Sequence, residues 1–383
     1  MLYTDFKGEK ISKLGFGTMR MPQVKAADGS DVEDIAHIER MVDIAIKGGV
    51  NYFDTAWPYH DGRSETIIGD ALRKYPRSTW FLADKYPGHQ QLEEYHPEEI
   101  FEEQLRKCGV DYFDFYLMHN VCENSIGVYL DPRWALLDYF LEQKKSGRIR
   151  HLGFSCHGEV DCLRRFLDSP WGRHMEFCQI QLNYVDWELQ HAKEKVQLLG
   201  ERGIPVWVME PQRGGLLSKH SAELAFRWLM EIPGVATVLS GMSSEEQMRQ
   251  NIDTFSSFRL LTTDERRSIE EYSDTVFSRV PCTACRYCTE GCPQHLDIPA
   301  LINACNQLRI PGMAFTPVMF LESLNAEQMP DACIGCGNCT HICPQHIDIP
   351  SVMEELADRY SKSVKWSDIC RERNKIAKEQ KAK

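Results

Sequence analysis

Eight cysteines in the C-terminal third of the chain follow two identical patterns, and cysteine thiolates are strong ligands for metals. Each pattern reads C-x2-C-x2-C-x3-C-P, and the second begins 51 residues after the first. The similarity continues past the cysteines, with CPQHLDIP at 292–299 and CPQHIDIP at 343–350, so the two segments are an internal duplication. The cysteines are Cys282, Cys285, Cys288 and Cys292 in one copy and Cys333, Cys336, Cys339 and Cys343 in the other.

The remaining sequence favours metal ligands over disulfides. The chain has 383 residues and 15 cysteines, and its first ten residues, MLYTDFKGEK, are charged and carry no apolar signal segment. Without export the cysteines meet a reducing compartment, where disulfides are rare. We therefore expect a cytoplasmic protein. We expect Cys305 and Cys370, which lie outside the two patterns, to be buried or free thiols.

The duplicated pattern resembles that of bacterial-type ferredoxins. In those proteins three closely spaced cysteines hold one [4Fe–4S] cluster, and the cysteine before proline ligates the other cluster. The resemblance implies two clusters, one on Cys282, Cys285, Cys288 and Cys343 and one on Cys333, Cys336, Cys339 and Cys292. Two structural zinc sites are the alternative, although zinc requires neither the third cysteine nor the Cys-Pro. The segments 299–309 and 350–362 each have proline near their start and predict helices, as in a helical ferredoxin module.

The first 275 residues alternate short apolar runs with amphipathic stretches such as 35–49 and 97–109. This alternation predicts a (β/α)8 barrel over residues 1–275, followed by a mainly helical ferredoxin-like domain over 276–383. The absence of an early G-x-G-x-x-G argues against a doubly wound fold. A hairpin turning at Lys7-Gly8 would close the bottom of the barrel. The eight predicted strands are 14–19, 50–56, 80–85, 114–119, 149–155, 178–184, 204–210 and 236–241.

Four ionisable residues follow successive predicted strands. Asp54 ends the second strand, Lys85 the third and His119 the fourth, and Tyr59 lies five residues past Asp54. Because barrel chemistry takes place at the carboxyl ends of the strands, the four side chains should meet at one rim.

The barrel region resembles the aldo-keto reductases, in segments that carry these residues. The resemblance implies an NAD(P)H-dependent oxidoreductase that reduces a carbonyl or oxidises an alcohol. Tyr59 would donate the proton, Lys85 would lower its pKa, Asp54 would hold Lys85, and His119 would orient the carbonyl. Asp84 stands where the family usually has a hydroxyl residue, and it could compete for Lys85. The matching segments are 15–20, 51–65, 82–87, 116–120, 153–158, 179–184, 211–217 and 234–253.

The same resemblance implies a nucleotide site. Ser155, Gln181 and Asn183 would hold the nicotinamide, and the Gly214-Gly215 turn would allow close approach of a pyrophosphate. In 240–251, where Arg249 is the only nearby cation, the choice between NAD(H) and NADP(H) stays open. The residues of that segment implied to bind the adenosine phosphate are Ser243, Ser244, Gln247 and Asn251.

Charge and composition exclude some partners and leave three functions open. The net charge of −12 argues against nucleic acid, and no apolar run approaches the roughly 18 residues of a membrane span. The first function is carbonyl reduction with clusters that are structural or redox-sensing. The second is electron transfer that couples the clusters to a flavin or to a redox protein partner. The third is a non-catalytic barrel that presents a ferredoxin module. We expect the basic tail, 371–383, to be a solvated helix end.

Overall fold

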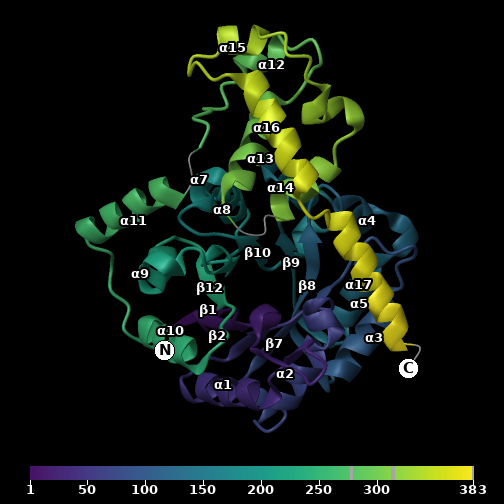
Figure 1. The fold of residues 1–383 in the computed structure, drawn as a ribbon. Coiled ribbons are helices and arrows are strands. Elements are labelled where there is room, and N and C mark those ends of the chain that lie inside the picture. The colour runs from purple at the N-terminus through teal and green to yellow at the C-terminus, as the bar shows by residue number, and fades with distance from the viewer. Residues whose placement is uncertain (277–278, 312–314, 382–383) are drawn as a thin grey trace.

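The chain folds as a closed barrel with a helical extension at one end (Figure 1), as a computed structural model describes it over residues 1–276, 279–311 and 315–381. Eight parallel strands close the barrel in the order β10-β11-β12-β3-β6-β7-β8-β9, so the predicted (β/α)8 fold is confirmed. All eight strands lie within or beside the predicted runs. They are β3 Leu14–Gly17, β6 Tyr52–Asp54, β7 Phe81–Tyr86, β8 Phe113–Val121, β9 Ile149–Cys156, β10 Cys178–Gln181, β11 Val206–Met209 and β12 Val235–Ser240.

Helices surround the strands, and local sequence sets where they begin and end. Asp34 accepts a hydrogen bond from the backbone N–H of His37 at the start of α1. Pro97 begins α3, and Gly109 ends it in the left-handed conformation with φ 64°. These helices are α1 Ile35–Lys47, α2 Ser64–Leu72, α3 Pro97–Cys108, α4 Ile126–Leu130, α5 Leu136–Lys145, α6 Val160–Asp168, α7 Asp186–Leu189, α8 Ala192–Glu201, α9 Ser218–Met230, α10 Glu245–Ser256 and α11 Thr263–Val276.

Two short hairpins precede α1. The first, β1 Tyr3–Phe6 with β2 Glu9–Ser12, turns at Lys7 and Gly8, whose φ values are 53° and 88°. Its Phe6 and Ile11 are buried in the cluster that fills the amino-terminal end of the barrel, so the predicted closing hairpin is present. The second hairpin consists of β4 Gln23–Lys25 and β5 Asp31–Glu33.

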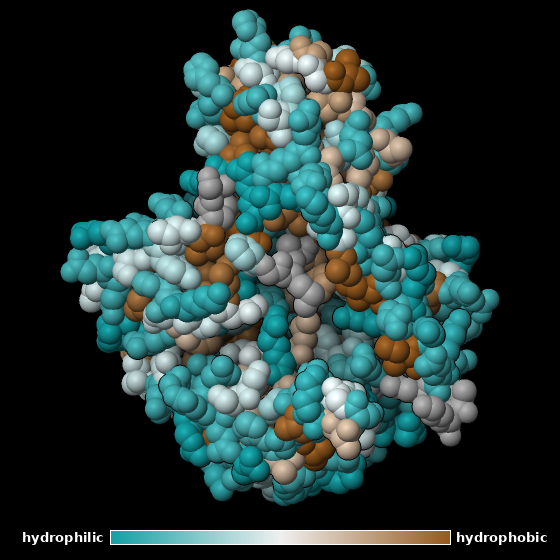
Figure 2. Space-filling view, in the orientation of Figure 1, coloured by the Kyte–Doolittle hydropathy of each residue, from teal (hydrophilic) through white to brown (hydrophobic). Residues whose placement is uncertain are grey.

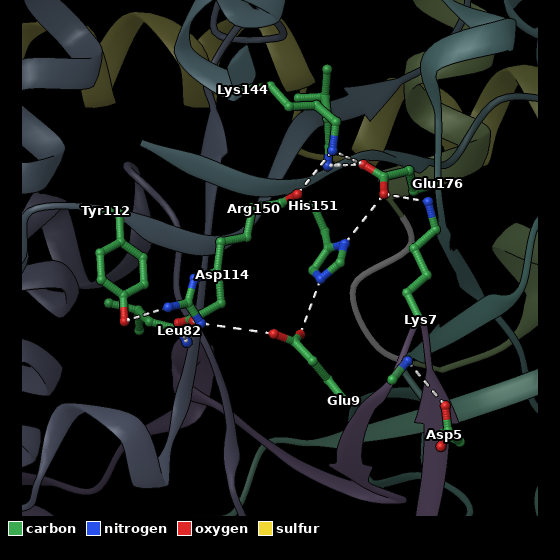
Figure 3. Close-up of polar contacts among 12 residues, drawn as sticks. Asp5, Lys7, Glu9, Leu82, Tyr112, Asp114, Lys144, Arg150, His151 and Glu176 are labelled. Carbon is green, nitrogen blue, oxygen red and sulfur yellow. Dashed lines mark hydrogen bonds and ion pairs between the residues drawn. The ribbon is translucent and has the colours of Figure 1, made fainter. Parts of the chain in front are cut away.

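Polar contacts hold the first hairpin to the barrel (Figure 3). The Lys7 Nζ lies 2.5 Å from Glu176 Oε2, and His151 lies between Glu176 and Glu9, at 3.2 and 3.0 Å. Burial by itself would raise the pKa of Glu176, but hydrogen bonds from His151, Lys144 and Lys7 outweigh it and hold that pKa below its usual range.

We expect Glu176→Gln to destabilise the protein by about 1–3 kcal/mol at pH 7, because it removes the charged acceptor of these bonds. A depressed folded-state pKa gives stability that is present above the ordinary value of 4.5 and is lost as pH falls through the folded-state pKa. The difference between the variant and the wild type should therefore shrink below about pH 4.5. Urea unfolding at pH 7 and at about pH 3 measures it. The exposed Glu142→Gln is the control, and a pH-independent difference would contradict the explanation.

The C-terminal part is helical and repeats the sequence duplication. Helices α13 and α16 begin at equivalent residues, each after an aspartate and with proline in the first turn, and they pack together. Helices α12 and α15 lie at the end farthest from the barrel (Figure 1). In the described ranges no helix combines the length and apolar character needed to cross a membrane. The helices are α12 Tyr287–Glu290, α13 Ile298–Arg309, α14 Phe315–Glu322, α15 Asn338–Ile342, α16 Ile349–Lys362 and α17 Trp366–Lys381.

The helix that carries the predicted tail, 371–383, packs on the barrel through residues just before that segment. Trp366 and Cys370 of α17 are buried against Met319 of α14 and Cys122 at the carboxyl end of β8. The Cys370 thiol lies 3.7 Å from the carbonyl oxygen of His89. Within the tail itself, Arg371, Glu372, Lys375 and Lys378 are exposed as expected, whereas Arg373 and Asn374 are partly buried. Residues 382–383 lie outside the described residues. Figure 2 shows hydrophobic residues gathered where the C-terminal part meets the barrel.

Candidate active site and cysteine-lined cavities

The fold brings the four predicted catalytic residues to the carboxyl end of the barrel. Asp54 is the last residue of β6, and Lys85 and His119 lie near the ends of β7 and β8. Tyr59 begins the short helix η2, Tyr59–Gly62, which directly follows β6. Parallel strands share one direction around a barrel, so residues far apart in sequence meet at this rim.

Lys85 is the centre of the site. Its side chain is fully buried, and Nζ donates hydrogen bonds of 2.6 Å to Asp54 Oδ1 and of 2.6 Å to the carbonyl oxygen of Thr55. The ammonium lies 5.0 Å from the centroid of the Tyr59 ring. Burial by itself would lower the pKa of Lys85, but Asp54 and Tyr59 outweigh it and raise that pKa. Lys85 therefore stays charged beside the phenol.

Gln179 is a member of this group that sequence reasoning missed. Its Nε2 donates a 3.2 Å hydrogen bond to Asp54 Oδ2, so both oxygens of that carboxylate are occupied. Gln179 lies two residues before the predicted Gln181 on β10, and alternate residues of a strand face the same side. That spacing was the signal in the sequence that could have identified it.

The pKa of Tyr59 is raised overall, although Lys85 acts to lower it as predicted. Burial raises it, and the opposing charge of Lys85 does not cancel that effect. The phenol is therefore protonated at neutral pH, which is the form that a proton donor needs.

His119 faces Tyr59 edge-on, with ring centroids 6.0 Å apart. Its pKa lies well below the ordinary value, first because of burial and then because of His89 and Lys85. The imidazole is therefore neutral. In the part of the chain that the structure describes, its Nδ1 is buried and has no hydrogen-bond partner. A neutral ring with an unpartnered nitrogen is suited to bind a ligand oxygen.

Asp84 does not bond to the Lys85 ammonium. Its side chain lies between β7 and the helices α2 and α3, where Oδ2 is 3.9 Å from the Cys108 thiol and Oδ1 accepts from the backbone N–H of Lys85. Burial, and next the charge of Glu65, raise the pKa of Asp84 well above its ordinary value. Asp84 is therefore neutral and faces away from the rim.

The predicted nicotinamide residues lie at the ends of β9 and β10. Ser155 Oγ accepts a 2.7 Å hydrogen bond from the backbone N–H of Asn120. The amides of Gln181 and Asn183 both donate to Asp186 Oδ2, at 2.8 and 2.6 Å, and Arg213 binds the other oxygen of Asp186 at 2.5 Å. The structure brings Gln181 and Asn183 together around this buried carboxylate.

Arg20 links the two segments that were predicted to bind phosphate. A Cβ added at Gly214 would lie 3.6 Å from its guanidinium, and one at Gly241 would lie 3.2 Å from its stem. Ser243 Oγ donates a 2.7 Å hydrogen bond to the carbonyl oxygen of Arg20. Arg20 is the last residue of the family-like segment 15–20, and the sequence pattern predicted no role for it. Arg20 pairs with Glu210 at 3.0 Å.

The other predicted residues of this region have local contacts. Gly214 and Gly215 have φ values of 66° and 92°, a backbone conformation that favours glycine. Ser244 caps α10 by accepting from the Gln247 N–H at 3.2 Å, and the side chain of Asn251 donates to Ser240 at 3.1 Å. The start of α10 therefore presents backbone N–H groups beside Ser243.

The eight predicted cluster cysteines line two cavities of the C-terminal part, four to each. One cavity is lined by Cys333, Cys336, Cys339 and the first copy's Cys292. The other is lined by Cys282, Cys285, Cys288 and the second copy's Cys343. In each cavity three cysteines of one copy face the Cys-Pro cysteine of the other copy, and isoleucine and proline residues line both cavities together with a glutamine.

The sequence model of the aldo/keto reductase family matches residues 13–223, more than half of the chain. This protein belongs to the aldo/keto reductase family. A second model, described as a 4Fe-4S dicluster domain, matches residues 281–347 and covers both cysteine patterns. The order of the two matches is the order predicted from the sequence.

Similar proteins extend over the barrel. The NADH-specific methylglyoxal reductase of Escherichia coli K12 is 25% identical over an alignment of 301 residues that covers 63% of this chain and 89% of that protein. The holo form of aldo-keto reductase AKR11C1 from Bacillus halodurans has a TM-score of 0.55 at 25% identity, over 71% of this chain and 95% of that chain. A Klebsiella pneumoniae aldo/keto reductase in complex with NADP and acetate, at 19% identity, has the same fold, with a TM-score of 0.55 over 71% and 95%.

We expect two aspartate-to-asparagine changes to separate the roles of Asp54 and Asp84. Asp54→Asn removes the counter-charge of Lys85 and should lower kcat/KM for carbonyl reduction by about 100-fold. Asp84→Asn replaces a neutral acid with an amide of the same shape, so kcat/KM should change by less than about threefold. Steady-state kinetics on both variants measure this. An equal loss in the two would show that the charge of Asp84 does act on Lys85.

Proposed function

We propose that this protein is an NAD(P)H-dependent carbonyl reductase, or alcohol dehydrogenase in the reverse direction, that carries two [4Fe–4S] clusters. The observation that supports this most is the charged Lys85, held by Asp54 beside a protonated Tyr59 and a neutral His119. A proton donor, a fixed cation and a neutral hydrogen-bonding ring are the groups that carbonyl reduction requires.

When bound, a reduced nicotinamide would supply the hydride. Tyr59 Oη gives its proton to the carbonyl oxygen as that oxygen gains negative charge, and Lys85 stabilises the phenolate that remains. His119 binds the same oxygen through its neutral ring and orients the carbonyl toward Tyr59. Asp54, Gln179 and the carbonyl of Thr55 hold the Lys85 ammonium in place.

The residues at the rim fit a nicotinamide nucleotide. Ser155, Gln181 and Asn183 would hold the nicotinamide end. The Gly214-Gly215 turn, where positive φ values leave the backbone open, would hold the pyrophosphate. Arg20, which lies between that turn and Ser243, adds a cation that the sequence interpretation lacked. Ser243, Ser244, Gln247 and Asn251 would bind the adenosine phosphate at the start of α10.

The geometry of the cysteines favours cubane clusters over zinc. In the described ranges no three His, Cys, Asp or Glu side chains come together closely enough to hold a single metal ion. The cysteines instead line two cavities, four to each, in the crossed arrangement. A cubane needs room inside its four thiolates, whereas tetrahedral zinc needs the thiolates in close contact.

Electron exchange with a redox protein partner is the second candidate function. Cys285 and Cys336 are exposed, so one side of each cluster would lie near the protein surface. A direct relay to a nicotinamide would need a carrier that accepts electrons in pairs and releases them singly, such as a flavin, and the flavin stays a prediction.

We place the protein in the cytoplasm, where thiolates stay reduced. We keep residue 275 as the end of the barrel domain.

We expect Tyr59→Phe to lower kcat for small aldehydes and ketones by about 1,000-fold, because it removes the proton donor. Iron and sulfide content should not change. Anaerobic spectroscopy on the same samples reports whether NAD(P)H reduces the clusters, which the electron-transfer function requires. Tyr3→Phe is the control, since Tyr3 is exposed at the opposite end of the barrel. Turnover retained in Tyr59→Phe would contradict the proposed catalytic role.

Crossed ligation makes a prediction about pairs of cysteine variants. Cys285→Ser and Cys343→Ser act on the same cluster, so the double variant should lose no more iron than either single variant, about four atoms of about eight. Cys285→Ser combined with Cys292→Ser acts on both clusters and should lose nearly all of the iron. Iron analysis of anaerobic protein measures both. The opposite pairing of losses would show that each copy holds its own cluster, and one bound zinc per site would contradict the clusters.

A further inference from the structure

Helix α17 of the C-terminal part lies against the mouth of the barrel. Trp366 stacks on His89, with ring centroids 5.6 Å apart, and His89 in turn lies 4.2 Å from the ring of His119. Further along the helix, Asn374 donates a 3.0 Å hydrogen bond to the carbonyl oxygen of Gln90. The helix also packs against η2, which carries Tyr59. The C-terminal part therefore forms part of the wall of the active site.

Arg373 lies on the same face of α17, one turn after Cys370 and next to Asn374. Its guanidinium is partly buried and lies 5.4 Å from the ring centroid of Trp366. Burial lowers the pKa of Arg373, while Cys370, Tyr59 and Asp61 act to raise it, so these groups lie within electrostatic reach. The charge of Arg373 also acts on His89 and His119, which burial already keeps neutral.

In the part of the chain that the structure describes, no carboxylate lies within ion-pair distance of this guanidinium, and Asp61 acts on it only at longer range. Across residues 1–276, 279–311 and 315–381 it makes no ion pair, whereas the other cations near the site are paired. Lys85 pairs with Asp54, Arg20 pairs with Glu210, and Arg63 pairs with Glu33. A partly buried cation without a counter-ion is costly, and a bound anion would remove that cost.

We propose that Arg373 binds the carboxylate of the substrate, and that the substrate is an oxo acid whose carbonyl lies close to that carboxylate. This inference rests on the proposed function. One unpaired positive charge matches a monoanion, and the planar guanidinium matches the two oxygens of a carboxylate. The adjacent rings of His89 and His119 are neutral, so they add no charge of their own beside Arg373. The helix that follows the cluster-binding part thus selects the substrate of the barrel.

The reaction would convert a 2-oxo acid to a 2-hydroxy acid. A hydride from NAD(P)H bonds to the carbonyl carbon, the C=O π bond breaks, and its oxygen takes the proton of Tyr59. The nicotinamide is oxidised by two electrons, and water restores the proton of Tyr59. The carboxylate keeps its charge throughout, so its bond to Arg373 orients the carbonyl without taking part in the chemistry.

The test compares phenylglyoxylate with its methyl ester, which has the same carbonyl but no charge. Arg373→Gln should raise KM for the acid at least 30-fold and change KM for the ester by less than threefold. Arg373→Lys keeps the charge but lacks the planar guanidinium, so its KM for the acid should lie between those of the wild type and Arg373→Gln. Arg371→Gln is the control, because Arg371 is exposed on the same helix and pairs with Asp368. An unchanged KM for the acid, or equal changes for both compounds, would overturn the inference.

Calorimetry with mandelate, the corresponding 2-hydroxy acid, tests binding apart from turnover. The holoprotein should bind mandelate, and Arg373→Gln should weaken that binding at least 30-fold. Equal binding by the two proteins, or no binding by the wild type, would contradict the anion site. Mandelate binding that depends on Arg373 in a protein that reduces neither compound would contradict the proposed function and leave the anion site supported.

Discussion

The ion pair between Lys85 and Asp54 is the interaction on which the barrel site depends. Two opposite charges are buried at 2.6 Å, and such a pair is stable only when further hydrogen bonds satisfy its remaining atoms. Thr55 supplies a carbonyl to Lys85, and Gln179 supplies an amide to the second oxygen of Asp54. Three strands of the barrel therefore meet in one polar group, and this group fixes the cation beside Tyr59.

The titratable side chains around this ion pair are mostly neutral. Burial keeps Tyr59 protonated, His119 neutral and Asp84 uncharged, although each belongs to a residue type that often ionises. Burial in a low dielectric has the same effect on all three, at the rim for Tyr59 and His119 and behind β7 for Asp84. A neutral surrounding makes the charge of Lys85 effective, and it also makes the unpaired Arg373 an unusual feature of the site.

The C-terminal part has two relations to the barrel. Its duplicated loops form two cysteine-lined cavities at the far end, while α14 and α17 pack on the carboxyl end of the barrel through Met319, Trp366 and Cys370. The chain thus leaves the barrel after α11 and returns to it as α17. This return makes the helical part a component of the active-site wall as well as a carrier of cysteines, which a division at residue 275 by itself would not suggest.

The sequence alone determined the features that depend on local pattern. Alternating apolar runs predicted all eight strands, and the Lys7-Gly8 turn predicted the hairpin. The resemblance of the repeated cysteine pattern to ferredoxins implied which thiols face one another across the two copies. Only the tertiary structure decided what depends on distant neighbours. Asp84 faces away from Lys85 and is neutral, Gln179 completes the pair with Asp54, and Arg373 arrives from a helix that reads as a solvated tail. The burial and the electrostatic environment of a residue depend on neighbours that lie hundreds of residues away in the sequence. No local sequence pattern therefore predicts them.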